Sequence, residues 1–158
     1  MIQLLFLSVL LSAADMPIAG WLETAKVFPG GLTIRAKLDT GAKTSSLDAR
    51  HIEKFERKGD DWVRFKVTDS NGKDVTLELP IERIVKIKRH KSPSQQRPVV
   101  FMNICLGNIF KKAEVNLVDR RVFNNKMLIG RNFLTGSFIV DPSSKYITKP
   151  KCGEVKAE

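Results

Sequence analysis

Two stretches of alternating polar and apolar residues, 62–68 and 75–79, are separated by a segment that contains Asn71-Gly72. Alternation with a period of two is the pattern of a β-strand with one buried face. Asn and Gly adopt the left-handed backbone conformations that tight hairpin turns require. The combination predicts a β-hairpin and therefore an antiparallel sheet in this part of the chain.

The same turn chemistry recurs at Gly107-Asn108, between the apolar runs 99–106 and 111–118. Residues 49–57 fit either a strand or a short helix, because Ile52 and Phe55 are three residues apart. Further strands are predicted at 21–27, 32–38, 83–89 and 137–140, with a polar loop at 90–96 and one helical turn at 131–134, while residues 44–49 either continue extended or bend.

No internal repeat or linker divides the 158 residues, a length that suits one domain with its own core. We predict an all-β domain over residues 15–149, with one or two short helices and a polar tail at 150–158. Closure into a barrel-like body would protect the strand edges from pairing with other chains.

The first residues differ in character from the rest. Residues 4–11 are an apolar run, and Ser12-Ala13-Ala14 follows with the small side chains of a cleavage site. The run is too short for a stable membrane span. It predicts a signal peptide over residues 1–14 and export, with the periplasm as the destination. A buried first strand or a start codon placed too far upstream are the alternatives.

The formal net charge is +10, which favours acidic partners as well as plain solubility. The basic stretch 83–91 contains no aromatic residue that could stack on bases, so we expect no nucleic-acid partner. Cys105 and Cys152 allow one disulfide in an exported protein, but Cys105 also fits an ordinary core position.

Asp39-Thr40-Gly41 follows the predicted strand 32–38 directly. A carboxylate in this position suits acid–base chemistry, and the Gly allows a substrate backbone to approach closely. Hydrolysis by aspartates needs two carboxylates that share one proton, one acting as base on water and the other as acid. The chain has a single Asp-Thr-Gly, and Asp141-Pro142 does not replace it. A catalytic pair therefore requires a homodimer with Asp39 from each copy.

Other catalytic chemistries find little support in the sequence. The only histidines, His51 and His90, are 39 positions apart and have no neighbouring Cys, so no zinc site is predicted. The chain also lacks a phosphate-binding loop of the Walker type. We expect no metal and no cofactor.

Several segments in order resemble the bacterial family of retropepsin-like aspartic endopeptidases, also described as ATP-dependent zinc proteases. The matching segments are 37–49, 62–65, 97–100, 114–120, 127–134 and 138–142. The resemblance implies a retropepsin-like fold and a peptide substrate. It implies that Asp39 is catalytic, with Thr40, Gly41, Ala42, Gly130 and Arg131 as supporting residues around the active-site turn. The hairpin tip with Asn71 and Gly72 is either a flap that binds substrate or an ordinary surface hairpin.

One position departs from the viral members of this fold. Where they have an acidic residue that pairs with the Arg of Gly-Arg-Asn, this chain has Lys43. Arg131 then needs another partner, and Asp48, Asp119 and Asp141 are candidates. Lys43 near the cleft would favour acidic substrate side chains. Two further possibilities stay open: a non-catalytic module that binds a peptide or polyanion on the same fold, and an amidase-like enzyme that trims acidic peptide tails.

Overall fold

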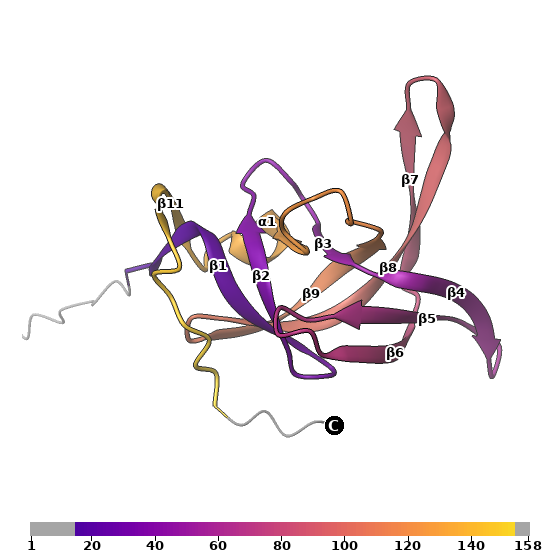
Figure 1. Cartoon of the computed structure of the whole chain (residues 1–158), viewed down its shortest axis with the longest axis horizontal. Helices are drawn as coiled ribbons and strands as arrows, with labels where there is room; N and C mark the ends of the chain where they lie inside the picture. The colour runs from indigo at the N-terminus through magenta and orange to yellow at the C-terminus, as the bar shows by residue number, and fades with distance from the viewer. Residues whose placement is uncertain (1–14, 154–158) are drawn as a thin grey trace, which may run out of the picture.

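The computed structural model describes residues 15–153, which form eleven strands and one short helix. The strands of the larger sheet are β1 (Ile18–Phe28), β2 (Leu32–Leu38), β3 (Ser45–Asp48), β7 (Arg83–Arg89), β8 (Ser92–Leu106), β9 (Ile109–Val118), β10 (Met127–Ile129) and β11 (Ile139–Lys145). The smaller sheet contains β4 (Arg50–Arg57), β5 (Asp60–Thr68) and β6 (Asp74–Pro80), and the helix is α1 (Arg131–Leu134). Figure 1 shows their arrangement.

The larger sheet closes on itself. Its strand order is β11-β1-β2-β10-β3-β9-β8-β7, and β1 also pairs with β8, with Lys26 opposite Cys105. The six strands from β1 to β8 in this order therefore form a ring of hydrogen-bonded neighbours. This arrangement confirms the predicted all-β, barrel-like fold with a short helix. The ring encloses the core, in which Ile34, Met127 and Phe133 are fully buried.

The smaller sheet contains the first predicted hairpin. β5 and β6 pair from Trp62 opposite Pro80 to Thr68 opposite Asp74, so the alternating residues of the sequence form the expected strands. The turn between them packs on β2: the Ser70 N–H donates to the Thr33 carbonyl at 2.8 Å, and the Ser70 hydroxyl accepts from the Arg35 N–H at 2.9 Å. β4 completes this sheet, which settles the ambiguous segment 49–57 as a strand.

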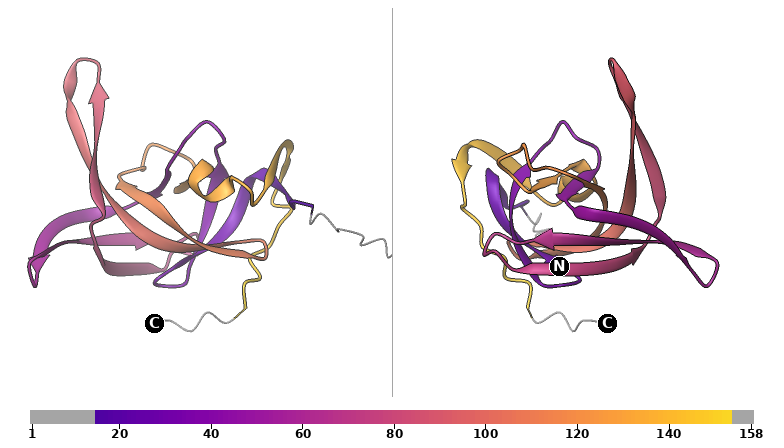
Figure 2. Two further views of the ribbon diagram at one scale, coloured as in Figure 1. Left: turned by 180° about the vertical axis from the view of Figure 1, so that it is seen from behind. Right: turned by 45° about the vertical axis from the view of Figure 1, so that its right-hand side comes forward.

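The second predicted hairpin is also present, with Leu106 opposite Ile109 across the Gly107-Asn108 turn. β8 is longer than predicted, because Ser92–Gln96 pairs with β7 instead of forming a loop. The loop predicted for residues 90–96 was therefore wrong from residue 92 on, because these polar residues form a strand through hydrogen bonds to β7. Residues 92–98 of β8 pair with β7 alone among the described strands, and the arm that they form with β7 stands away from the body (Figures 1 and 2).

The end of the described chain is held at two places. The carboxylate of the fully buried Glu23 accepts hydrogen bonds from the N–H groups of Ile147 and Thr148. Further on, Cys152 forms a disulfide with Cys105, and the Lys151 N–H donates to the Gly107 carbonyl at 2.7 Å. Residues 150–153 of the predicted tail are therefore attached to the domain. The predicted signal peptide, residues 1–14, lies outside the described residues.

Candidate active site

Asp39 follows the last residue of β2, and its backbone is fixed by the neighbouring strand. The Asp39 N–H donates to the carbonyl of Ile129 at 2.9 Å, at the end of β10. The side chain is half-buried, and its Oδ1 accepts the Gly41 N–H at 2.9 Å. Among residues 15–153 its second oxygen, Oδ2, has no hydrogen-bond partner. Thr40 and Gly41 are exposed, so this turn is presented to the outside of the single chain.

The turn after Asp39 rests on the beginning of α1. The N–H groups of Arg131 and Asn132 donate to the carbonyls of Ala42 and Lys43, each at 2.9 Å. Gly130 is buried here, and a Cβ at this position would lie 2.9 Å from the Ala42 carbonyl oxygen and 3.0 Å from that of Thr44. Only glycine fits this approach of two backbones.

Polar side chains link the same turn to β3 and β9. The Ser45 hydroxyl accepts the Gly130 N–H at 3.1 Å and donates to Asn132 Oδ1 at 2.9 Å. Asn132 Nδ2 in turn donates to the carbonyl of Glu114 at 2.7 Å. Because these bonds join segments far apart in the sequence, they fix the position of the Asp39 turn relative to the sheet.

Arg131 holds the turn without any carboxylate partner from within the described chain. Its Nη1 donates to the carbonyl oxygens of Thr40 at 3.0 Å and Gly41 at 2.8 Å. The three partners proposed from the sequence are engaged elsewhere: Asp48 pairs with Arg50, Asp119 with Arg121, and Asp141 accepts from Ser143 and Ser144. That expectation was wrong. Lys43 offers Arg131 no negative charge, and two backbone carbonyls accept the hydrogen bonds of the guanidinium instead.

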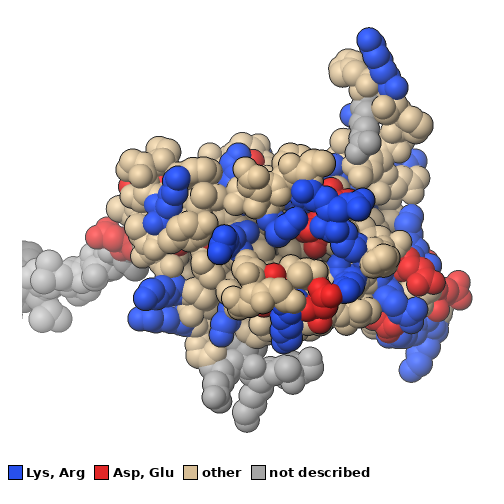
Figure 3. Space-filling view, in the orientation of Figure 1, with Lys and Arg blue, Asp and Glu red and all other residues tan. Residues whose placement is uncertain are grey.

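A groove of 530 Å³ lies beside the Asp39 turn, between residues 42–44, the inner face of the β7–β8 arm and the strands β3 and β9. Val85 and Ile87 of the arm face it, while Lys86 and Lys88 alternate to the outer face. Its cationic lining residues are Lys43, Arg83, Arg97 and Arg120. Figure 3 shows a group of Lys and Arg side chains near the base of the arm.

Glu114 is the acidic residue in the lining of this groove. Arg83 donates to both of its carboxylate oxygens, at 3.1 and 2.8 Å. These hydrogen bonds lower the pKa of Glu114 against the opposing effect of its burial, and the charges of Arg83 and Lys43 lower it further. The pair Arg83–Glu114 is thus internally balanced, and the lining keeps an excess of positive charge.

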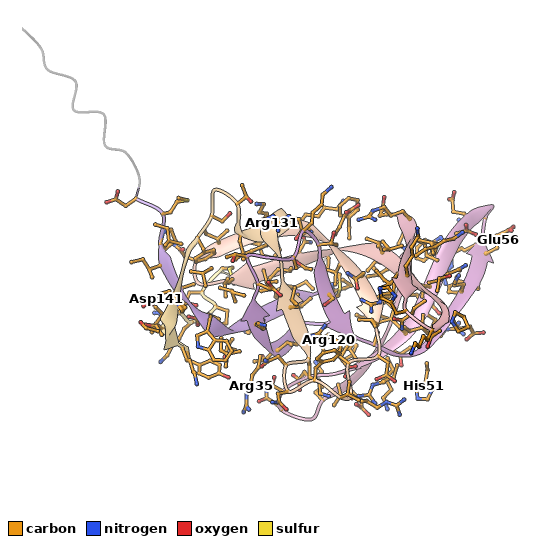
Figure 4. All side chains as sticks on the ribbon, turned by 90° about the horizontal axis from the view of Figure 1, so that it is seen from above. Arg35, His51, Glu56, Arg120, Arg131 and Asp141 are labelled. Carbon is orange, nitrogen blue, oxygen red and sulfur yellow. A yellow bond between two sulfur atoms is a disulfide. The ribbon has the colours of Figure 1, made fainter. Side chains whose placement is uncertain are left out.

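Arg120 is the most buried of the groove cations, with 9% of its surface exposed. Burial lowers its pKa, and the positive charge of Arg97 lowers it further. The charges of Asp48 and Asp39 act in the opposite direction, which places Arg120 within electrostatic reach of the catalytic candidate. In Figure 4, Arg120 and Arg131 both lie in the middle of the molecule, between Asp141 at one end and Glu56 at the other.

The structure brings most of the predicted site residues together. Asp39, Thr40, Gly41, Ala42, Gly130 and Arg131 form one turn and its support, and Lys43 lines the adjoining groove. Asn71 and Gly72 lie elsewhere within one copy. Their turn packs at Thr33, which is six residues before Asp39 along β2 and therefore about 20 Å from it. The hairpin beside the groove is the β7–β8 arm.

Sequence reasoning assigned no role to Arg97, Asn116 or Arg120, which line the groove. The available signal was weak: all three occur in segments that match the retropepsin-like family, but nothing in the sequence shows which charges a fold will bury. Within residues 15–153, no group of three or more His, Cys, Asp or Glu side chains is arranged to hold a metal ion. The one described helix is too short to cross a membrane.

A family model described as "RimB-like: Retropepsin-like aspartic endopeptidase RimB" matches residues 18–151. A crystal structure of a protein of unknown function (DUF785) from Legionella pneumophila is 38% identical, with a TM-score of 0.73; the match covers 85% of this chain and all of that one.

Two curated relatives, each named "Probable alpha-L-glutamate ligase", come from Shewanella pealeana and Desulfotalea psychrophila. They are 31% and 32% identical over 79% and 70% of this chain. The matched parts are 28% and 24% of those proteins, so the chain spans about a quarter of the length of the curated relatives it matches.

Proposed function

The chain belongs to the RimB-like family of retropepsin-like aspartic endopeptidases, and from this we propose that it hydrolyses peptide bonds with two Asp39 carboxylates, one from each copy of a homodimer. The observation that carries the proposal is the position of Asp39. The Asp39 N–H donates to Ile129 of β10, the turn after it is bonded to the start of α1, and its Oδ2 has no partner within the described chain. Such a carboxylate is rigidly held and still available.

The chemistry follows from placing two such groups together. Two carboxylates about 3 Å apart cannot both ionise easily, so they share one proton. The ionised carboxylate takes a proton from water, and the protonated one donates to the carbonyl oxygen of the scissile peptide bond. The attacked carbon becomes tetrahedral, and its collapse with proton transfer to nitrogen releases the two peptides. Arg131 and Gly130 hold the turn in place.

The exposure of Thr40 and Gly41 supports the homodimer. These residues lie at the tip of the turn, where a second copy would bring its own turn into contact. A two-fold axis through this contact places the same residues of both copies opposite each other. The dimer would complete a site that one chain, with its single Asp-Thr-Gly, lacks.

We propose peptides rich in acidic residues as the substrate class. The groove beside Asp39 carries Lys43, Arg97 and Arg120 in addition to the balanced pair Arg83–Glu114, and the whole chain has a net charge of +10. Such a field attracts anionic chains and raises their rate of encounter. The relatives named alpha-L-glutamate ligase add support, because their name refers to glutamate. A glutamate-containing peptide fits both observations.

A second candidate is the non-catalytic module that binds an acidic peptide or another polyanion. The observation that favours it is that the groove cations lie beside Asp39, and Asp39 itself is not among the residues that line the groove. Binding in the groove would then need neither a proton transfer nor a second copy. Cleavage assays separate the two candidates.

We also propose that the protein is exported. The disulfide between Cys105 and Cys152 supports this, because such bonds persist in oxidising compartments such as the periplasm. Export would remove the apolar leader, so protein recovered from native cells is expected to begin near Asp15. Mass spectrometry that finds Met1 intact would contradict export.

The proposed activity is tested by incubating purified protein with glutamate-rich and glutamine-rich peptides and analysing the products by mass spectrometry. Cleavage of the glutamate-rich peptide by the wild type, and its loss in Asp39→Asn, are expected. The thermal midpoint of the variant should stay close to that of the wild type, because the exchange preserves size. Cleavage that persists in Asp39→Asn would exclude Asp39 as the catalytic group.

A further inference from the structure

Arg120 carries a largely buried charge that has no counter-ion in contact among the described residues. Its Nη1 donates to the Ser46 hydroxyl at 3.1 Å and its Nε to the carbonyl of Asn125 at 3.2 Å, both neutral acceptors. Within residues 15–153 it forms no salt bridge, and its Nη2 has no hydrogen-bond partner. Asp48 is close, but it binds the Arg120 backbone N–H at 2.6 Å and pairs its carboxylate with Arg50.

The chain itself satisfies this guanidinium only in part, because Nη2 has no partner among residues 15–153 and is not fully buried. Buried guanidinium groups are normally paired, because the loss of water around a charge is compensated only by an opposite charge or by full hydrogen bonding. The repulsion between Arg97 and Arg120 adds to the cost. Arg97 donates to Gln95 Oε1 and also lines the groove, so an anion bound there would satisfy Nη2 of Arg120 and offset the repulsion.

The ring of Phe123 keeps the guanidinium in place. Its centroid lies 4.6 Å from Cζ of Arg120, a cation–π contact that restricts how far the side chain can turn. Together with the bonds to Ser46 and Asn125, this contact fixes the guanidinium in one orientation before any ligand arrives. A pre-oriented group loses less entropy on binding.

Asn116 adds a second requirement at the same groove. Its Nδ2 donates to the Ser45 carbonyl at 3.0 Å, but its Oδ1 is buried and has no hydrogen-bond partner among the described residues. A buried carbonyl oxygen without a donor costs free energy. The ligand that satisfies the groove should therefore supply a hydrogen-bond donor as well as an anion. An acidic residue in a peptide has both, in its backbone N–H and its carboxylate.

We infer that Arg120, with Arg97, is the specificity-determining residue that binds a carboxylate of the peptide, while Asn116 Oδ1 accepts an N–H of the same peptide. The inference rests on the proposed function only in taking a peptide as the ligand. The carboxylate comes either from an acidic side chain or from the free C-terminus, and the two sources require different peptides to tell them apart.

The test measures binding in an Asp39→Asn background, so that no peptide is consumed and catalysis is not required. Fluorescein-labelled hexapeptides serve as probes in fluorescence anisotropy: hexaglutamate with an amidated C-terminus, hexaglutamine with a free C-terminus, and hexaglutamine with an amidated C-terminus. The variants are Arg120→Gln, Arg97→Gln and the control Lys86→Gln. Lys86 lies on the outer face of the same arm, so the control removes one positive charge without touching the groove.

Arg120→Gln should weaken binding of a carboxylate-bearing peptide roughly tenfold or more, as expected for loss of a charged hydrogen-bonding partner. Arg97→Gln should weaken it less, and Lys86→Gln less than twofold at 0.15 M salt, where distant charges are screened. A selective loss for amidated hexaglutamate identifies the side chain as the source, and a selective loss for free hexaglutamine identifies the C-terminus.

Equal effects of Arg120→Gln, Arg97→Gln and Lys86→Gln would overturn the inference, since general charge attraction would then explain the binding. Because Arg120 also bonds Ser46 and Asn125, its variant must first be shown to keep the wild-type circular dichroism spectrum. If it does not, the inference is tested with Arg97→Gln alone. A loss of peptide affinity no larger than that caused by Lys86→Gln contradicts the inference. These outcomes leave the peptidase proposal untouched, because that proposal fails only in the cleavage assay.

Discussion

The side chain of Arg131 binds the backbone of Thr40. Its Nη1 donates to the carbonyl oxygen of Thr40 at 3.0 Å and to that of the next residue, Gly41, at 2.8 Å. The side chain of Arg131 is exposed, and these two bonds are its hydrogen bonds within the described residues. A single guanidinium nitrogen thus links the helix α1 to the residues that immediately follow Asp39. This contact explains how the turn keeps its shape with Lys43 in the position that acidic residues hold in viral retropepsins.

Replacing Arg131 tests that contact. Arg131→Ala should lower kcat/KM roughly tenfold, because two charge-assisted hydrogen bonds to the turn are lost, each partly replaced by water. The thermal midpoint should change little, since the side chain is exposed. Arg131→Lys should recover part of the activity by restoring one donor. Wild-type activity in Arg131→Ala would show that the turn holds its geometry without the guanidinium.

Gly130 offers a test of the backbone contact beneath the same turn. Gly130→Ala would bring a methyl group within 2.9 Å of the Ala42 carbonyl oxygen, and backbone atoms cannot move aside as a flexible side chain does. We expect a loss of about 1–3 kcal/mol in the free energy of unfolding, together with reduced cleavage. The control is Thr135→Ala, an exposed position at the end of α1, which should stay within about 0.5 kcal/mol of wild type.

The sequence patterns that proved reliable were local ones. The alternation around Asn71-Gly72 and the turn at Gly107-Asn108 each specify a hairpin through short-range backbone preferences, and both hairpins are present. The alternation of residues 32–38 likewise predicted the strand that ends directly before Asp39, and that strand is present as β2. Residues 92–96 were misassigned because Ser, Pro and Gln are typical of loops, and only pairing with β7 makes them a strand.

The features that escaped prediction depend on contacts between distant parts of the chain. The burial of Arg120 follows from bonds to Ser46 and Asn125, and no local pattern around residue 120 indicates it. The partners of Arg131 were misassigned for a similar reason. They are backbone carbonyls, which every residue has, so the sequence does not show which of them Arg131 contacts. Whether Cys105 meets Cys152 depends on the path of the 46 residues between them.

The disulfide is expected to stabilise the domain. It closes a loop between positions 47 apart in sequence, and restricting such a loop in the unfolded chain is worth about 2–4 kcal/mol. Adding a reductant should therefore lower the midpoint of urea unfolding, and the Cys105→Ser/Cys152→Ser double variant should be insensitive to it. A midpoint that does not respond to reductant in the wild-type protein would argue against this contribution.

Asp48 should contribute a pH-dependent part of the stability. Burial tends to raise its pKa, but hydrogen bonds from Arg50 and the Arg120 N–H, with the charges of Arg50 and Lys126, lower it below the ordinary value of 3.8. A carboxylate whose pKa is lower in the folded state stabilises the protein above its unfolded pKa and loses this effect as pH falls through the folded pKa.

The measurement compares wild type with Asp48→Asn in urea unfolding between pH 7 and pH 2. The variant should be less stable at pH 7, and the difference in unfolding free energy should shrink below about pH 4. Taking the difference removes the contributions of the other carboxylates. A difference that stays constant over the whole range would mean that Asp48 does not ionise differently in the two states.

The central claim is that two copies of the chain build one catalytic site, each contributing Asp39. It is tested most directly by mixing wild-type protein with Asp39→Asn at concentrations where dimers predominate, and measuring cleavage of a glutamate-rich peptide per wild-type chain. Random exchange of subunits leaves about half of the wild-type chains in wild-type dimers at an equimolar ratio, so activity should fall to about half and continue to fall as the variant is added. Activity that stays constant at every ratio would show that a single chain cleaves alone and would contradict the shared site.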